Sequence, residues 1–242
     1  MTERKAMLVV GAGDATGGAI AKRFAREGYV ACVARRHADK LEPLVDEITA
    51  AGGSARAFGC DARVEEQVLE LFETIEREIG PLEVVVFNIG ANVQFSITET
   101  TERVYRKVWE MAALAGFLTG REAARVMLPR KRGSIIFTGA TASLRGRANF
   151  SAFASAKFAL RALAQSMARE LGPQGIHVAH PIIDGAIDTA FIRETFPETY
   201  RLKEQDGILN PEHIAETYWQ IHCQPRDCWV HELDLRPWME SF

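Results

Sequence analysis

Short apolar runs alternate with longer amphipathic stretches along most of the chain. The apolar runs are often β-branched, as expected for strands that are buried on both faces of a sheet. They lie at Met7–Gly11, Tyr29–Ala34, Ala55–Gly59, Leu82–Asn88, Ser134–Gly139 and Ile176–Ile183. The stretches between them repeat apolar residues at three- and four-residue spacing, which indicates helices with one apolar face. These predicted helices are Thr16–Gly28, Ala38–Ala51, Val64–Gly80, Thr100–Met127 and Phe150–Gly172.

The alternation of strands and helices predicts right-handed crossovers and a doubly wound parallel sheet, the Rossmann type of α/β fold. Several predicted helices end in a glycine, which suits a left-handed C-cap: Gly28, Gly52, Gly80 and Gly172. No internal repeat or low-complexity linker interrupts the pattern. We therefore expect a single nucleotide-binding domain over residues 1–242.

The regular pattern lapses after Ile183. Residues 184–210 show no clear period, and a loop of this length in a compact domain is usually functional or mobile. We interpret it as a loop that covers the substrate. A last helix is predicted to open at Pro211, because proline suits a first helical turn. A short strand is predicted at Trp229–Leu233, and the tail Trp229–Pro237 is a candidate for packing across a neighbouring subunit.

Composition narrows the possible partners. The 242 residues carry a formal net charge of −3, with both signs interspersed. A nucleic-acid or anionic-membrane surface would show as a basic patch, so neither partner is expected. The chain has no apolar run of about 18 residues and no apolar signal-peptide core before Met7. We therefore expect a cytoplasmic protein with no membrane association.

The cysteines do not form a recognisable framework. Cys32, Cys60, Cys223 and Cys228 are scattered, so no disulfide is predicted. Two imidazoles flank the last two thiols in the segment from His222 to His231, so a zinc ion is conceivable there. The two-residue cysteine spacing of a structural zinc site is missing, so we expect no metal.

A glycine-rich turn follows the first predicted strand and leads directly into a helix. It reads Gly11-Ala-Gly13-Asp-Ala-Thr-Gly17-Gly18. Glycine lets the backbone bend tightly and approach a pyrophosphate, and the helix N-terminus then offers free N–H groups. In this position between a strand and a helix, the turn predicts a dinucleotide site.

The residues after the second strand select the dinucleotide. NAD sites place an acidic residue there to bond the ribose 2′-hydroxyl, whereas this strand ends in Arg35 and Arg36. Arginine matches a phosphate with a planar fork of donors, so NADP(H) is favoured over NAD(H). Asp14, within the turn, is a mild argument against a nearby phosphate. One of the two arginines is also compatible with a solvated charge at a strand end.

From Ala6 to Pro237 the order of these pieces resembles the short-chain dehydrogenase/reductase family. The family turn reads T-G-x-x-x-G-x-G, and this chain has Val10, Gly11, Ala15 and Gly17 at those places. We expect Gly13 to supply the flexibility that Ala15 removes.

The resemblance also implies further cofactor contacts. The matching positions are Asp61 at the adenine, Asn88 and Gly90 in the turn after the fourth strand, Gly185 in a turn that reads Pro-Gly in the family, and Thr189 at the nicotinamide carboxamide.

The family's four catalytic positions are mostly altered. Lys157 matches the family lysine, which anchors the nicotinamide ribose and lowers the tyrosine pKa. The position of the proton-donating tyrosine is Phe153, and that of the serine which holds the substrate oxygen is Ala140. The asparagine position, judged from Leu114-Ala-Gly116, is Ala113.

Other residues do not readily replace the missing hydroxyls. The tyrosine position of the family's enoyl reductases is Phe150, and Thr138 and Ser143 are poor proton donors near pH 7. Tyr200 lies in the covering segment, where an ordinary surface role is favoured. His180 is interpreted as a satisfied core or rim histidine.

Two functions remain open. The first is NADP(H)-dependent hydride transfer to or from a small carbonyl or alcohol substrate, and the second is a catalytically inactive NADP(H)-binding sensor or partner subunit. Whether the chain turns over substrate is left open by the missing tyrosine. The resemblance also implies a homodimer or homotetramer built on the two long helices, whose candidate outer residues are Phe117, Leu118, Phe158 and Leu160.

Overall fold

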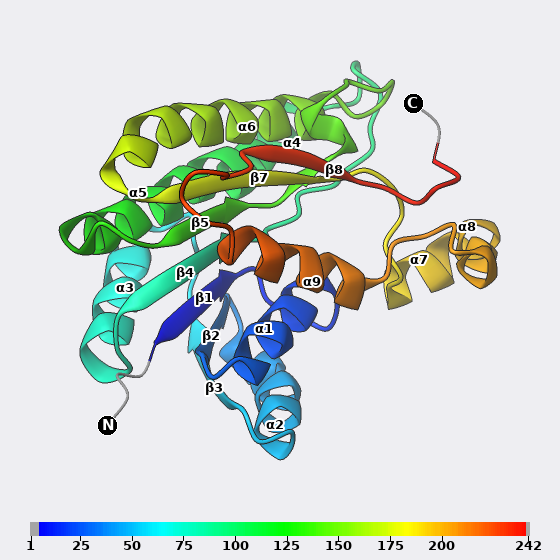
Figure 1. Ribbon diagram of the computed structural model, residues 1–242. Coiled ribbons are helices and arrows are strands. Elements are labelled where there is room, and N and C mark those ends of the chain that lie inside the picture. The colour runs from blue at the N-terminus through cyan, green and yellow to red at the C-terminus, as the bar shows by residue number, and fades with distance from the viewer. Residues whose placement is uncertain (1–4, 241–242) are drawn as a thin grey trace.

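The computed structural model describes residues 5–240, which form a parallel β-sheet with helices on both faces (Figure 1). The strand order is β3-β2-β1-β4-β5-β7-β6, and β8 pairs with β7. The strands are β1 Ala6–Val10, β2 Val30–Arg35, β3 Ser54–Gly59, β4 Leu82–Phe87, β5 Ser134–Phe137, β6 Gly139–Ala140, β7 His177–Ile183 and β8 Glu232–Leu235. The strand order reverses at β1, between β2 and β4. A doubly wound α/β fold is therefore confirmed.

The helices form one layer on each side of the sheet (Figure 1). One layer contains α1 Thr16–Arg26, α2 Glu42–Ala50 and α9 Pro211–His222. The other contains α3 Glu65–Glu78, α4 Glu102–Trp109, α5 Ala115–Met127 and α6 Ser151–Leu171. Two short helices, α7 Ala190–Thr195 and α8 Pro197–Arg201, lie beyond the end of β7.

The central strand shows why apolar runs become buried strands. Leu8 and Val10 pack on the side of α3, α5 and α6, whereas Met7 and Val9 pack on the side of α1 and α9. Side chains alternate along a strand, so a strand covered on both faces is apolar at every position. All of β1 is at most 3 % exposed.

The long predicted helix over residues 100–127 contains an irregularity that its periodicity does not reveal. A π-helical turn, Glu110–Leu114, separates α4 from α5. The turn adds one residue to the helical repeat. It lets Val108 of α4 join an apolar cluster beside α6, while α5 faces the sheet. Regular spacing on either side of the turn produced the expectation of one continuous helix.

The glycine C-caps were predicted correctly at three of four positions. Gly28, Gly52 and Gly80 have φ of 85°, 83° and 143°. Gly172 does not, since α6 ends at Leu171 and Gly172 begins a right-handed 3₁₀ turn with φ of −53°. The left-handed residue is Gly175, with φ of 89°.

The last strand also differs from its prediction, because it begins at Glu232 rather than at Trp229. Contacts with side chains replace regular strand pairing in the residues before it. The Val230 N–H donates to Oε1 of Gln224 at 2.8 Å, and the Trp229 ring stacks on His177 with centroids 4.8 Å apart.

The segment 184–210 was predicted to lack regular structure, and this is wrong in part. It contains α7, α8 and a 3₁₀ turn, Leu202–Gln205. None of these elements has a buried residue. Helices that are this short and this exposed leave no apolar period in the sequence.

Candidate functional site

A cavity of about 870 Å³ opens at the carboxyl ends of the central strands. Its walls come from the glycine-rich turn, the ends of β4 to β7, the start of α6 and the covering segment. A second cavity of about 270 Å³ adjoins it at the ends of β1, β2 and β3. Ligands of open α/β sheets bind at this edge, where the strand order reverses.

The glycine-rich turn is shaped by close backbone contacts at Gly11. This residue has φ of 89°, and an added Cβ would lie 2.9 Å from the backbone of Asn88. An added Cβ at Gly17 would lie 2.8 Å from the carbonyl oxygen of Gly11. The Asn88 side chain donates to that same carbonyl at 3.2 Å. The turn therefore requires glycine at both positions.

Gly13 does not have the role that we expected. Its φ lies outside the left-handed region, and an added Cβ would meet no atom within 4 Å. Gly11 already supplies the left-handed residue that the turn needs. The turn therefore tolerates alanine at position 15, immediately before α1. Ala15 offers no side-chain hydrogen bond to the helix end. The first N–H groups of α1 are thus left for an anion.

The second cavity brings together three sequence-predicted residues, Arg35, Arg36 and Asp61. It also contains Arg63, which the sequence analysis missed. The Arg63 guanidinium donates to both oxygens of the Asp61 carboxylate, at 2.9 Å and 2.5 Å. These bonds hold the pKa of Asp61 below its usual value, with a smaller contribution from the charge of Arg36. The sequence signal that could have revealed Arg63 is its position two residues after Asp61, in an Asp-x-Arg pattern that follows a strand.

Lys157 lies in α6 with its side chain almost completely buried, at 3 % exposure. Its ammonium donates to the carbonyl oxygens of Thr138 at 3.0 Å and Ile89 at 3.4 Å. Burial lowers the pKa of Lys157 to about 8, because no carboxylate compensates for lost hydration. The side chain lines the larger cavity.

Two of the three altered catalytic positions line the same cavity, namely Phe153 and Ala140. Ala113 is buried in the π-helical turn and does not line either cavity. Phe153 belongs to an apolar cluster whose other buried members are Ala91, Val108, Ala112, Ala142, Ala152, Ala154 and Ala156. The surroundings of Phe153 are therefore apolar.

The hydroxyls of Thr138 and Ser143, two possible replacements for the missing catalytic groups, form hydrogen bonds with other parts of the protein. Thr138 Oγ1 is hydrogen-bonded to the Tyr218 hydroxyl at 2.9 Å. Ser143 is completely buried and accepts from the Ala140 N–H at 3.1 Å. Tyr200 lies on α8 and lines neither cavity, whereas Phe150 lines the larger one.

His180 is a core residue, as expected, but it is not satisfied. Its ring is completely buried. Nδ1 lies 3.4 Å from Oε1 of Glu232, but neither ring nitrogen has a well-formed hydrogen bond within the described part of the chain. Burial lowers the pKa of His180 to about 4, so the ring is neutral near pH 7. The ring lies against Gly139, where an added Cβ would come within 2.7 Å of His180 Cε1.

The turn after β7 carries a buried carboxylate. Asp184 is completely buried and accepts from the Thr141 hydroxyl at 2.6 Å and from Arg145 at 3.2 Å. Gly185 follows with φ of 153° and lines the cavity. Thr189 also lines it, and its hydroxyl accepts from the Ile192 N–H at 3.1 Å to cap α7.

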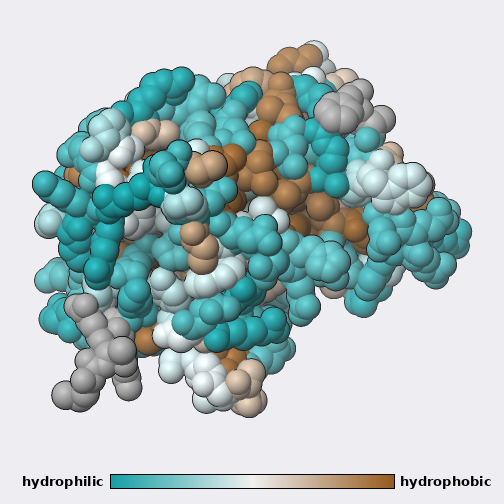
Figure 2. Space-filling view, viewed as in Figure 1, coloured by the Kyte–Doolittle hydropathy of each residue, from teal (hydrophilic) through white to brown (hydrophobic). Residues whose placement is uncertain are grey.

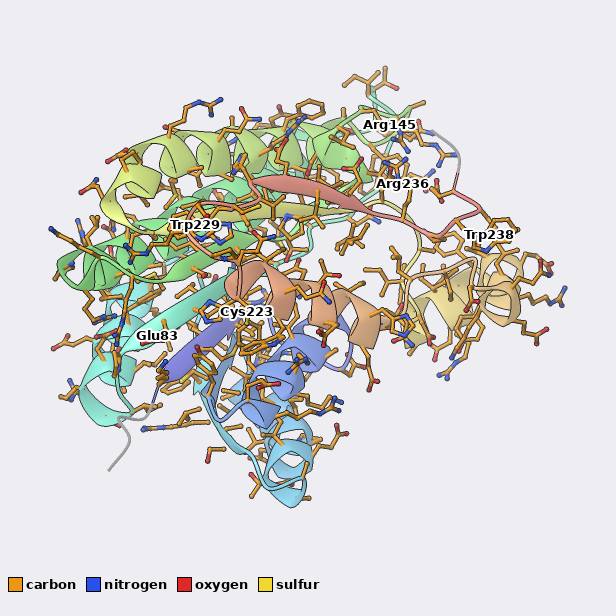
Figure 3. The ribbon with its side chains drawn as sticks, viewed as in Figure 1. Glu83, Arg145, Cys223, Trp229, Arg236 and Trp238 are labelled. Carbon is orange, nitrogen blue, oxygen red and sulfur yellow. The ribbon has the colours of Figure 1, made fainter. Side chains whose placement is uncertain are left out.

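The tail after β8 fastens the covering segment within the same chain. We call Arg236–Glu240 the C-terminal strap. The Trp238 indole donates to the Gln205 carbonyl at 3.0 Å, and Pro237 packs against Gly185. Glu240 reaches the wall of the larger cavity. Figure 3 shows Trp238 beside the short helices and Arg236 close to Arg145. Packing across a neighbouring subunit remains a prediction.

Apolar side chains gather on one part of the surface. Figure 2 shows apolar surface gathered between β8 and α7, next to hydrophilic surface over α9.

Within residues 5–240, no group of three or more His, Cys, Asp and Glu side chains is arranged to hold a metal. His222 instead bonds the hydroxyls of Ser134 and Tyr29, both at 2.8 Å. No helix in this part of the chain is long and apolar enough to cross a membrane.

The sheet, the turn and the two cavities define a dinucleotide-binding α/β protein. Residues 5–199 match the model of the short chain dehydrogenase family, and the chain belongs to this family. The family comprises oxidoreductases that bind nicotinamide cofactors and act on small molecules.

Similar proteins agree with this assignment. An uncharacterised oxidoreductase of Staphylococcus aureus strain MRSA252 is 27% identical, over 96% of this chain and 97% of that protein. A short-chain dehydrogenase structure from Rhodopseudomonas palustris is 50% identical with a TM-score of 0.83, covering 97% of this chain and 99% of that one. An alcohol dehydrogenase from Thermococcus sibiricus, solved with 5-hydroxy-NADP, is 26% identical with a TM-score of 0.87, covering 99% of both chains.

Proposed function

We propose that this protein is an NADP(H)-dependent oxidoreductase that transfers hydride to or from a small carbonyl or alcohol substrate. The observation that carries the proposal is the continuous larger cavity, which extends from Gly11 and Gly17 to Lys157 and Phe153. A nicotinamide dinucleotide is a long molecule. The larger cavity offers a site for one end of it, and the adjoining cavity offers a site for the other end. The glycine backbone of the turn and the N-terminus of α1, which no side chain caps, suit a pyrophosphate.

The preference for NADP(H) is proposed from the charges around the smaller cavity. Arg35 and Arg36 line it, and neither forms an ion pair with an acidic side chain in the described residues. Arg63 is held in place by Asp61 on the same wall. A 2′-phosphate placed there would meet guanidinium donors and no free carboxylate except Asp14 at the turn.

The cofactor test compares both dinucleotides by fluorescence titration. The expected result is a lower Kd for NADPH than for NADH, and a loss of this difference in the double variant Arg35→Ala/Arg36→Ala. Lys40→Ala, a nearby exposed lysine that lines neither cavity, serves as the control. Equal affinity for both dinucleotides in the unaltered chain would contradict the proposed preference.

When bound, the nicotinamide supplies or accepts the hydride. The chain's own residues would then position it and the substrate. The Lys157 ammonium has one N–H left after its two carbonyl bonds, and it can hold the nicotinamide ribose. Phe153 and Ala140 exclude water and fill space, but they neither donate a proton nor bond a substrate oxygen.

These replacements predict slow turnover. A positioned general acid contributes roughly 10²–10⁴-fold, and one oxyanion donor roughly 10²–10³-fold, although the two are not additive. A panel of carbonyl substrates should therefore give low rates with NADPH, and Phe153→Tyr combined with Ala140→Ser should raise kcat. Negligible rates in both forms, with NADPH binding intact, would favour the inactive sensor or partner subunit. A high rate in the unaltered chain would exclude it.

Assembly and compartment are also proposals. Phe117 and Phe158 are 42 % and 41 % exposed on α5 and α6, whereas Leu118 and Leu160 are buried in the core. The two exposed rings support a homodimer or homotetramer formed through these helices. The cytoplasm is proposed as the compartment from the sequence alone. Light scattering after size exclusion should show an oligomer that Phe158→Glu weakens.

A further inference from the structure

The larger cavity is poor in groups that can exchange a proton near neutral pH. Its ionisable lining residues in the described part of the chain are Asp14, Arg145, Arg147, Lys157 and Glu240. Asp14 and Arg147 are exposed, and Glu240 belongs to the C-terminal strap. Arginine does not lose its proton in proteins. Lys157 is thus the only buried ionisable group among them.

The hydroxyls of the lining do not fill this gap. Thr138 is bonded to Tyr218, Thr141 donates to Asp184, and Thr189 caps α7. The fourth hydroxyl of the lining, that of Thr16, lies at the other end of the cavity, where α1 begins. An aliphatic hydroxyl also holds its proton far too tightly to act as an acid near pH 7. Within residues 5–240, Lys157 is the remaining candidate at the inner end of the cavity.

The surroundings of Lys157 suit proton exchange. Its ammonium contacts two carbonyl oxygens and forms no ion pair with any residue from 5 to 240, so no carboxylate among them stabilises the charged form. Burial alone lowers its pKa to about 8, which leaves both protonation states populated near neutral pH. Nζ lies 6.0 Å from the centre of the Phe153 ring. A substrate oxygen held between that ring and Nζ would be within reach directly or through one water molecule.

We propose that Lys157 is itself the acid/base of this site, and that the one N–H left after its two carbonyl bonds is directed to the substrate oxygen. The proposal rests on the proposed NADP(H)-dependent hydride transfer. In the reducing direction, hydride from NADPH forms the new C–H bond and the carbonyl π pair moves to oxygen. The Lys157 ammonium gives a proton to that oxygen, which yields the alcohol, NADP⁺ and a neutral amine. The amine then regains a proton from solvent.

The alternative is that Lys157 only positions the cofactor. A positioning role needs a positive charge with hydrogen-bond donors, which arginine also supplies. An acid/base role needs a proton that leaves, which arginine does not release. Lys157→Arg therefore separates the two roles, and Lys157→Met removes both.

The experiment measures NADPH affinity by fluorescence and the pH dependence of carbonyl reduction at saturating NADPH. The expected kcat of the unaltered chain falls as pH rises through about 8, because the protonated form is the donor. Alcohol oxidation should show the opposite trend. Lys157→Arg should keep NADPH affinity within about threefold, yet lose roughly 100-fold in kcat together with the pH step. Lys22→Arg, a partly exposed lysine on α1 paired with Glu47 at 2.8 Å, should change neither quantity.

A second readout does not depend on turnover. Lysine-selective ¹⁵N NMR of the unaltered chain, assigned with Lys157→Arg, should show one lysine that titrates well below the others. A Lys157 signal with an ordinary lysine pKa would overturn the proposal. So would a Lys157→Arg variant with unchanged kcat and pH profile, or an absence of turnover despite tight NADPH binding. A failure to bind NADPH at all would instead refute the proposed function itself.

Discussion

Arg145 forms an ion pair with Asp184 at 3.2 Å, and the Asp184 side chain is completely buried while the Arg145 side chain is 40% exposed. The pair joins the loop before α6 to the turn after β7, and Arg145 lines the larger cavity. A second guanidinium, that of Arg236 in the C-terminal strap, lies 3.9 Å from the same carboxylate. Asp184 therefore connects three segments that are distant in the sequence.

Asp184→Asn should destabilise the protein, because it keeps the size of the side chain but leaves the two guanidiniums without their shared charge. We expect a loss of roughly 1–3 kcal/mol, less than for a fully buried pair since Arg145 can turn towards water. Urea unfolding measures it. Asp234→Asn is the control, because Asp234 also pairs with Arg236 but is 36% exposed. Equal losses in the two variants would contradict this account.

Gly11→Ala should damage the glycine-rich turn much more than Gly13→Ala. The first substitution places a Cβ 2.9 Å from the Asn88 backbone at φ of 89°, whereas the second meets nothing within 4 Å. Strain of this kind costs roughly 1–3 kcal/mol before the clash is counted. Thermal unfolding should show a clear fall in Tm for Gly11→Ala and almost none for Gly13→Ala. Similar Tm values would show that the turn relaxes.

His222 should make the protein sensitive to acid. Burial lowers the pKa of His222 to about 4, below its unfolded value of about 6.5, so the folded state binds fewer protons. The stability that this provides is fully present above pH 6.5 and is lost as the pH falls towards 4. The shift corresponds to at most roughly 3 kcal/mol.

The comparison is urea unfolding at pH 7 and pH 4.5 for the unaltered chain and His222→Gln. The variant should lose less stability over this interval, although His180 still contributes to the pH dependence. His213→Gln changes an exposed histidine and should behave like the unaltered chain. An unchanged pH dependence in His222→Gln would rule out this role.

Trp238→Ala should loosen the covering segment without unfolding the domain. The Trp238 side chain is 77 % exposed, so its loss removes little buried area, but its indole bond to Gln205 disappears. Hydrogen exchange should speed up around Leu202–Gln205 while the Tm changes by only a few degrees. Trp238→Phe keeps a ring without the N–H donor and should show most of the same effect. Unchanged exchange in both variants would mean that Pro237 alone fastens the segment.

The sequence predicted the sheet, its helices and the glycine-rich turn, because burial on two faces leaves an unbroken apolar pattern. It did not predict the π-helical turn at Glu110–Leu114, since apolar spacing is regular on each side of it. The role assigned to Gly13 was wrong because a motif gives positions but not backbone angles. Gly11 provides the left-handed residue instead.

The sequence predicted the position of some site residues but not of others. Lys157, Phe153 and Ala140 line one cavity, as the family resemblance implied, while Ala113 lies outside it. The C-terminal strap left no trace in the sequence, because its contacts with Gly185 and Gln205 depend on where β8 releases the chain.

The contact between His180 and Gly139 leaves little tolerance for a side chain beside Ala140. An added Cβ at position 139 would come within 2.7 Å of the completely buried His180 ring and 3.0 Å from the Pro181 carbonyl oxygen. A smaller residue in place of His180 would relieve only the first of these contacts. A side chain at position 139 therefore also needs a change in the backbone of β7, so evolution is expected to retain glycine there.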